Sequence, residues 1–274
     1  MQETFFIFHY SLSSIARKMI SQLNSIFHSF SNLTPRSQRL AIAAAAGVII
    51  GIPVFRIAAE DYRGYLALGP GGPPHNLIGW IGQILLKPLK RESFHTNCYD
   101  EKACEKAGPN GHIAFLSEKD VPVRKAPRPM IGKWTAPSRQ LTDMANHSLI
   151  DRYQSFLSSL ASSSSSKLKI ATSLAERRGP ALFVASNKPS HPIAKRTGGE
   201  IGHMHGSDGS THINLAPKDA KLVLERGWGQ RHPLSGTVLY LGNVMVYAPR
   251  NEDELEIVKN ITRAGVKFML GEEC

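Results

Sequence analysis

Cysteine is scarce in this chain of 274 residues. Its three cysteines are too few for a disulfide scaffold, and no C-x-x-C pair is present for zinc or redox chemistry. The 23 glycines and 17 prolines are ordinary frequencies, which excludes a collagen-like or wholly disordered chain. Acidic residues number 22 against 33 basic ones, so the net charge of +11 favours anionic partners. A hydrophobic fraction of 42% is enough for a sizeable buried core.

The basic residues do not form the pattern of a nucleic-acid-binding surface. Those between 167 and 196 are spread over turns and strands, and those between 124 and 139 lie in a Pro-broken stretch without interleaved aromatics. No helix-turn-helix, zinc-finger or RNA-recognition signature accompanies them. We therefore expect solvated charged faces and no nucleic-acid partner.

Residues 1–37 are predicted to form an amphipathic helix. Apolar side chains recur at spacings of three and four, and Arg17 and Lys18 lie off the stripe that they form. Such a helix fits a membrane interface, with its cations near lipid phosphates, or it packs on the protein's own core. The stripe consists of Leu12, Ile15, Ala16, Met19, Leu23, Ile26, Phe27 and Phe30.

Residues 38–59 are predicted to be a transmembrane helix. The run 40–55 has no charged or strongly polar side chain, and the apolar pattern continues beyond it with Arg56 as the only interruption. A bilayer core needs about 20 apolar residues, and a cation near the end of a span reaches the headgroups. A buried core helix is the alternative. The Gly47-x-x-x-Gly51 spacing would allow weak self-association in the bilayer.

These segments predict a single-pass protein of an endomembrane, in contact with membrane lipid. Its orientation stays open, because two arginines precede the span and two follow it closely. Cys98 and Cys104 would form a disulfide in a lumenal domain or remain reduced in the cytosol.

Residues 60–134 are expected to be a membrane-proximal connector. Glycines and prolines fill 69–74, an apolar stretch over 77–89 could graze the membrane, and later prolines keep the chain extended. The main domain is then expected at 135–274, where a helix begins at Pro137.

The last 110 residues alternate strand and helix signals, which predicts an α+β fold: an antiparallel sheet with helices packed on one face. Pro217 opens a helix that stops before Gly227. Asn251 caps another helix, with Glu254 three residues on, and Gly265 closes it. We predict strands over 168–174, 181–185, 200–205, 211–215 and 238–247.

Histidines mark the candidate site. Residues two apart on a strand share a face, so His203 and His205 point together, about 7 Å apart. His212 begins the partner strand, where the short turn would bring it opposite His205, and Glu200 faces away unless a bulge intervenes. Three imidazoles on one face suit a divalent metal with open positions, metal-free acid–base work, or structural hydrogen bonding.

The segment 228–233 follows a predicted helix end, so we expect it to be a loop. Its indole would stack on an aromatic anion, and its amide would hydrogen-bond to that anion. Its guanidinium and the imidazole of His232 would help to hold the anion in place. The alternative is a tryptophan that covers the core beside solvated cations. The candidate substrate-binding residues, two of them near the last helix, are Trp228, Gln230, Arg231, Tyr247 and Arg250.

The stretch from Glu200 through Gly-Trp-Gly-Gln-Arg-His-Pro-Leu to Tyr-Ala-Pro-Arg-Asn-Glu strongly resembles the fungal luciferase family. Upstream the likeness is weaker but includes the apolar N-terminal segment, Gly69-Pro70 and Gly79-Trp80, so it spans nearly the whole chain. The turn after His205 is more similar to family members not shown to be luminous.

The resemblance implies an activity. In that family the luciferase oxidises a hydroxylated styryl-pyrone with molecular oxygen, and a peroxidic intermediate decarboxylates with emission of light, without an organic cofactor. For this chain it implies a membrane-anchored oxidoreductase that acts with O2 on a small anionic aromatic or pyrone-type substrate. A histidine serves as general base, and the expected catalytic residues are His203, His205, His212 and His232.

Two other functions remain open at this point. One is a membrane-tethered module that binds a small molecule without turnover. The other is an enzyme of different specificity that depends on a divalent metal, with His203, His205 and His212 as ligands.

Overall fold

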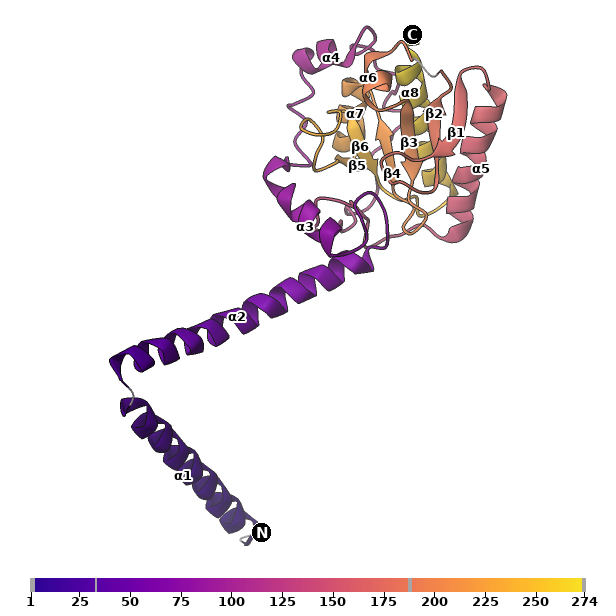
Figure 1. Ribbon diagram of the computed structural model, residues 1–274. Helices are drawn as coiled ribbons and strands as arrows, with labels where there is room; N and C mark the ends of the chain where they lie inside the picture. Colours follow the sequence, from indigo (N-terminus) through magenta and orange to yellow (C-terminus); the bar gives the residue numbers. More distant parts are fainter. Residues whose placement is uncertain (1–2, 33, 187–188, 273–274) are drawn as a thin grey trace. The chain divides into compact units, whose positions relative to one another are not determined.

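The computed structural model describes residues 3–32, 34–186 and 189–272 (Figure 1). The chain divides into two compact units, Met1–Asp61 and Tyr62–Cys274.

The first unit is helical. Helix α1 (Glu3–Ser31) is followed by α2 (Pro35–Ala67), whose last turns belong to the second unit. Side chains are described from residue 17 onward, and there the apolar stripe of α1 is exposed at Met19, Leu23 and Phe27. The stripe positions Leu12, Ile15 and Ala16 lie outside the described side chains.

Helix α2 contains the predicted span 38–59. It is long and apolar enough to cross a membrane, and none of the residues in its apolar window is buried within the structure. Pro53 lies inside the helix without ending it.

The second unit is built on one antiparallel sheet of six strands with the order β1-β2-β3-β4-β6-β5. Two hairpins form its first four strands, as the sequence predicts. The strands are β1 (Leu168–Thr172), β2 (Pro180–Val184), β3 (Glu200–Met204), β4 (Thr211–Asn214), β5 (Gly229–Arg231) and β6 (Asn243–Val246).

Three helices pack on one face of this sheet, which confirms the α+β prediction (Figure 1). Helix α5 (His147–Ser163) packs against β1 and β2, α8 (Glu252–Leu270) against β3 and β4, and α7 (Pro217–Glu225) against β5 and β6. The shorter helices are α3 (Leu77–Leu85), the 3-10 turn η1 (Lys87–Leu89), α4 (Glu101–Ala107) and α6 (Pro192–Arg196).

The segment 60–134 differs from the predicted connector. The compact unit begins at Tyr62, and Tyr99, Leu116 and Val121 are buried in the same hydrophobic core as the sheet and its helices. These three buried residues are separated by prolines and glycines and show no helix or strand periodicity. The sequence pattern therefore does not identify them as part of the core. Residues 135–274 are therefore only part of the folded unit.

Several predicted element ends are wrong. Helix α8 does not end at Gly265 but continues to Leu270, where Gly271 closes it with a φ of +74°. Gly265 instead lets the helix approach the sheet, since a Cβ there would lie 2.8 Å from Ile213. Helix α5 begins after Asn146 rather than at Pro137, because the Asn146 side chain accepts the capping hydrogen bond from Leu149 N–H. The predicted strand 238–247 is formed only as β6.

Candidate functional site

Four buried histidines gather on the face of the sheet opposite the helices. Their neighbours along the strands, Met204 and Ile213, point into the core, so the alternating side chains of β3 and β4 point the other way. The ring centroids of the touching pairs lie between 4.9 and 5.4 Å apart. His212 touches each of the other three: His203, His205 and His232.

The register of the hairpin differs from the prediction. His212 pairs with His203 across β3 and β4, not with His205. The turn is long enough that His205 lies beyond the paired residues, where it closes the turn through its N–H bond to Ser210 O.

A bulge in β3 brings Glu200 to the histidine face. Phe183 pairs with Glu200 and Leu182 with Gly202, so Ile201 is an extra residue on β3. The Glu200 carboxylate consequently lies 2.7 Å from His203 Nδ1. The bulge that the sequence leaves open is therefore present, and Glu200 joins the site.

The partners of Glu200 fix the proton on His203. Burial alone would raise the pKa of Glu200, but hydrogen bonds from His203, Ser173 and the Leu174 backbone outweigh it and hold the pKa below its ordinary value. An ionised carboxylate only accepts hydrogen bonds, so His203 Nδ1 carries a proton. In neutral His203 the lone pair is then on Nε2, which lies 3.8 Å from Glu176 Oε2.

A second chain of hydrogen bonds orients His205. Its Nδ1 lies 2.9 Å from Ser210 Oγ, and the Ser210 hydroxyl donates to Asp208 Oδ1. Nδ1 must therefore be the donor to Ser210, which leaves the lone pair on Nε2. Burial lowers the pKa of His205 well below its ordinary value, with contributions from the charges of Arg139 and His203, so this ring is neutral at pH 7.

His232 and His212 are also neutral at that pH. Burial and the neighbouring His203 lower the pKa of His232 to about 3. Its Nδ1 accepts the Leu234 N–H at 3.1 Å, so the ring proton is on Nε2. Burial and the other three histidines lower the pKa of His212 well below its ordinary value. Among the described residues, no group hydrogen-bonds to His212 Nδ1.

The four imidazoles line a cavity of about 180 Å³. Segments 71–73 and 136–139 and the side chains of Leu234 and Leu239 form its other walls. A neighbouring cavity of about 370 Å³ shares His203, His212 and Leu239 with it. The two cavities together are of the size that small-molecule sites have.

The charged groups of this cavity are Arg139 and Glu176. They form a buried ion pair between Arg139 Nη2 and Glu176 Oε1. The Nε and Nη1 groups of Arg139 are buried and have no hydrogen-bond partner among the described residues. Arg139, Glu176 and Ser173 are not predicted from the sequence, because only the tertiary fold places them beside the histidines. Asp208 is not predicted either, although it lies three residues after His205 in the expected hairpin turn.

The five predicted substrate-binding residues line neither cavity. Trp228 is buried in the core on the helix side, and its indole N–H donates to Pro122 O. Gln230 and Tyr247 contact each other, with 3.2 Å between Oε1 and the hydroxyl. Arg231 donates to Glu92 O and Cys98 Sγ, and Arg250 pairs with Glu254.

The physical reason is that residues 229–231 form the edge strand β5 and not a loop. The side chains of Gln230 and Arg231 alternate between the two faces of the sheet, so they cannot surround one ligand. Of this predicted loop, only His232 reaches the cavity.

One group of side chains in the cavity has the composition of a metal site. Glu176, His203 and His205 each offer a ligand atom, and these atoms lie within 4.8 Å of one another. The carboxylate takes the place of His212 in the predicted ligand set. Hydrogen bonds to the outer nitrogens of both histidines, of the kind seen here with Glu200 and Ser210, orient metal-ligating imidazoles in proteins.

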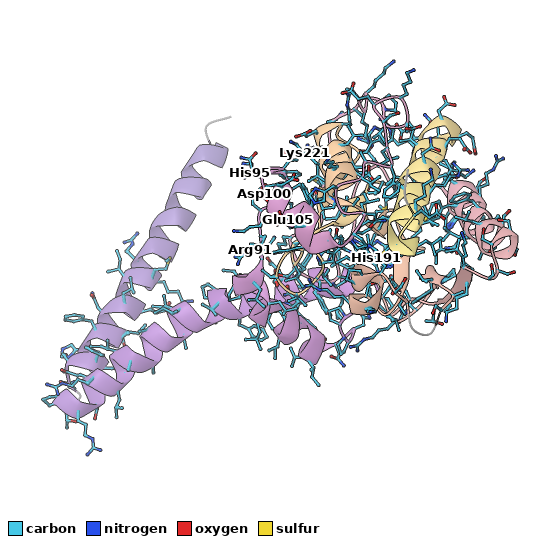
Figure 2. The ribbon with its side chains drawn as sticks, turned by 90° about the horizontal axis from the view of Figure 1, so that it is seen from above. Arg91, His95, Asp100, Glu105, His191 and Lys221 are labelled. Atoms are coloured by element: carbon cyan, nitrogen blue, oxygen red, sulfur yellow. The ribbon has the colours of Figure 1, made fainter. Side chains whose placement is uncertain are left out.

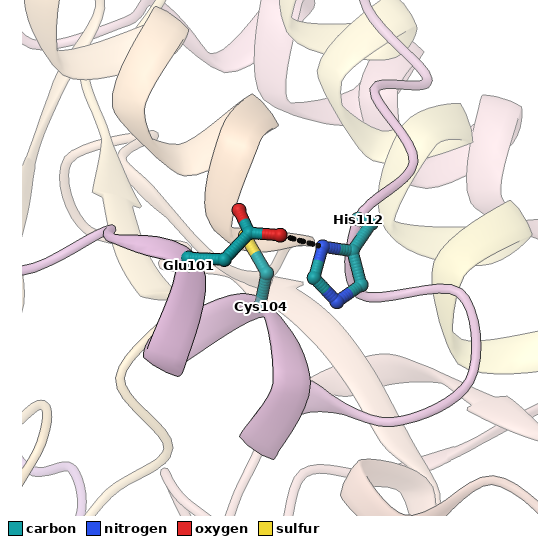
Figure 3. Close-up of side chains that lie close together, drawn as sticks. All are labelled: Glu101, Cys104 and His112. Carbon is teal, nitrogen blue, oxygen red and sulfur yellow. Dashed lines mark ion pairs between the residues drawn. The ribbon is translucent and has the colours of Figure 1, made fainter.

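A second such group lies on α4 and the loop after it (Figure 3). His112 Nδ1 and Glu101 Oε1 are 2.9 Å apart, which an ordinary ion pair explains, and both side chains are exposed. Cys104 is buried beside them, and burial raises the pKa of its thiol. Cys98 is also a free thiol, so the two cysteines do not form a disulfide.

The chain is similar to known luciferases. Residues 198–265 match the family model Luciferase domain. The luciferase of Neonothopanus nambi is 32% identical over 269 residues, covering 90% of this chain and 93% of that protein. The luciferase of Armillaria mellea is 30% identical over 259 residues, covering 85% and 90%.

No solved structure matches the chain. The segment matched by the family model contains Glu200 and all four clustered histidines. The similarity to the luciferases extends far beyond that segment, over most of both chains. The chain belongs to the fungal luciferase family.

Proposed function

We propose that this protein is a membrane-anchored, luciferase-like oxidoreductase that uses O2 to oxidise a small anionic aromatic or pyrone-type substrate without an organic cofactor. The observation that carries the proposal is the buried Glu200–His203 pair on the wall of a cavity lined by histidines. Membership of the luciferase family supports oxidative chemistry at this site.

His203 is the general base of the proposal. A phenolic or enolic substrate has to lose a proton before O2 attacks its electron-rich carbon. The Nε2 lone pair of His203 is available for that proton, and the Glu200 carboxylate at 2.7 Å from Nδ1 stabilises the imidazolium that forms. No other imidazole of the cluster touches a carboxylate as closely, among the described residues.

Arg139, and not Arg231 or Arg250, is the cation of the proposal that holds the substrate anion. Its two unpartnered N–H groups are suited to hold the substrate anion. The apolar walls formed by Pro73, Leu234 and Leu239 would exclude water from a peroxidic intermediate.

Oxygen uptake tests the proposal. The full chain in membranes or detergent is given hydroxylated pyrones and related phenols, and dissolved O2 is followed with an electrode. We expect uptake with at least one pyrone, lost in His203→Ala. A wild-type protein that binds these compounds without consuming O2 would be a binding module and not an oxidoreductase.

A metal-dependent enzyme is a second candidate, because Glu176, His203 and His205 bring three buried ligand atoms together. In that case His203 would be a ligand and not a base. Incubation with a chelator, followed by gel filtration, separates the two candidates. Activity that is lost and then restored by a divalent cation favours the metal, and unchanged activity favours the base.

Membrane anchoring is proposed for residues 38–59 within α2. The full chain should resist extraction from membranes by alkaline carbonate. Deletion of residues 1–59 leaves the compact unit that starts at Tyr62 intact and should make the protein extractable by carbonate or salt. Sedimentation and immunoblotting measure both. A full chain that salt removes from membranes would contradict the span.

A further inference from the structure

We propose that α3 and the turn after it form a second membrane contact, which lies on the surface of an anionic bilayer. This contact is separate from the span in α2, and its docking does not depend on the proposed function.

The apolar side of helix α3 faces solvent. Leu77, Ile78 and Leu85 are exposed, and the relative solvent accessibility of Ile78 is 74%. The polar Gln83 is fully buried, and its Oε1 accepts a hydrogen bond from the Thr135 N–H at 3.2 Å. A helix that packs on its own protein shows the reverse pattern. Ile81 and Leu89 are exposed as well, so the apolar face continues through η1.

The exposed charges that directly follow this face are mostly basic, with Glu92 as the first acidic residue after them. Between Tyr62 and Arg91 the sequence contains no aspartate or glutamate. Lys87, Lys90 and Arg91 are exposed directly after the apolar residues (Figure 2 labels Arg91). Anionic headgroups attract such clusters of cations electrostatically.

A bilayer is the occupant that fits both features. The apolar side chains would enter the boundary between headgroups and acyl chains, and the cations would meet lipid phosphates. The chain also keeps the face near a membrane, since Leu77 follows the end of the proposed span at Ala59 by only eighteen residues. A protein partner would need a surface that is both apolar and acidic.

Hydrogen bonds connect the exposed apolar face of α3 and η1 to a wall of the histidine-lined cavity. Leu89 O accepts a hydrogen bond from Thr237 Oγ1 at 3.1 Å, and the Arg91 N–H donates to Pro233 O at 2.8 Å. The segment from Pro233 carries the cavity-lining Leu234 and Leu239. Docking would thus hold this wall at the bilayer surface, where a hydrophobic aromatic substrate of the proposed reaction dissolves.

Photocrosslinking tests the contact in the full chain. Benzoylphenylalanine replaces Ile78, and the protein is reconstituted into vesicles of phosphatidylcholine with phosphatidylglycerol. The control places the same residue at Ser155, an exposed position on α5, which covers the opposite end of the sheet. We expect a lipid adduct by mass spectrometry at position 78 and none at position 155. No lipid adduct at 78, equal adducts at both, or a crosslink to a second protein would overturn the proposal.

A charge-reversal variant provides the second part of the test. Lys87→Glu combined with Lys90→Glu changes only exposed side chains, so the thermal transition should stay the same. The adduct at position 78 should fall several-fold in anionic vesicles and change little in phosphatidylcholine alone. An adduct that does not respond to the reversal contradicts an anionic surface as the occupant. Oxygen uptake is measured in parallel, and an inactive protein that still forms the adduct refutes the proposed function and not the docking.

Discussion

Replacement of Glu200 by Gln is expected to lower the rate of substrate oxidation by about 100- to 10 000-fold, the usual contribution of a general base. Glutamine keeps the shape but has no negative charge to stabilise the imidazolium of His203. Its amide can also turn an NH2 donor toward Nδ1, so the proton on Nδ1 is no longer fixed. His203→Ala should lower the rate to the same degree, and the double variant should lose no more than either single one.

The control for this prediction is Ser173→Ala. It removes one hydrogen bond to the same carboxylate at 2.8 Å and leaves the charge in place, so its rate should fall much less. Single-turnover oxygen uptake measures the rates, and thermal melting shows that each variant is folded. Full activity in Glu200→Gln would show that the pair is structural.

Stability is expected to fall steeply when the pH drops below 6.5. Burial lowers the pKa values of His205, His212 and His232 in the folded protein, to about 3 for His232. Below pH 6.5 the unfolded chain therefore takes up protons that the folded chain does not. The free energy of unfolding then decreases by up to about 1.4 kcal/mol per pH unit for each histidine. For the three histidines together the decrease is up to about 4 kcal/mol per pH unit.

Glu200 acts in the same direction at lower pH. Its folded pKa lies below its unfolded value, so its contribution to stability is lost as the pH falls through the folded pKa. Denaturant titrations of the solubilised chain between pH 7.5 and 5 measure the slope. His232→Asn, whose side-chain oxygen accepts the Leu234 N–H in place of Nδ1, should make the slope shallower by up to about 1.4 kcal/mol per pH unit. The buried Asp219, whose pKa is raised to about 7, opposes this trend, so the comparison with the variant is decisive. A slope that His232→Asn leaves unchanged would mean that His232 is protonated or open to solvent in the folded protein.

Much of the fold follows from local patterns in the sequence. The hairpin of β3 and β4 is predicted by two short strand-like segments on either side of a Gly-Ser-Asp-Gly turn, and the helix α7 by Pro217 and Gly227. Gly265 shows the limit of such patterns. A glycine that ends a helix and a glycine that lets a helix approach a sheet look the same until the tertiary packing is known.

The candidate site is only partly predictable, because local patterns do not show which segments meet in the folded chain. The alternation of β3 is enough to place His203 and His205 on one face, and the bulge at Ile201 then decides that Glu200 joins them. Arg139 and Glu176 could not be found, because they lie 37 residues apart in irregular segments that meet only in the folded unit. Trp228 was misplaced because a three-residue edge strand has too few residues to show its alternation.

The most direct test of the central claim is single-turnover oxygen uptake with a hydroxylated pyrone, measured for the wild type and for His203→Ala after treatment with a chelator. The account predicts that the wild type consumes one O2 per pyrone oxidised and keeps its rate without metal, whereas His203→Ala binds the pyrone and consumes O2 about 100- to 10 000-fold more slowly. Undiminished oxygen uptake by His203→Ala, or pyrone binding by the wild type without any uptake, would contradict it.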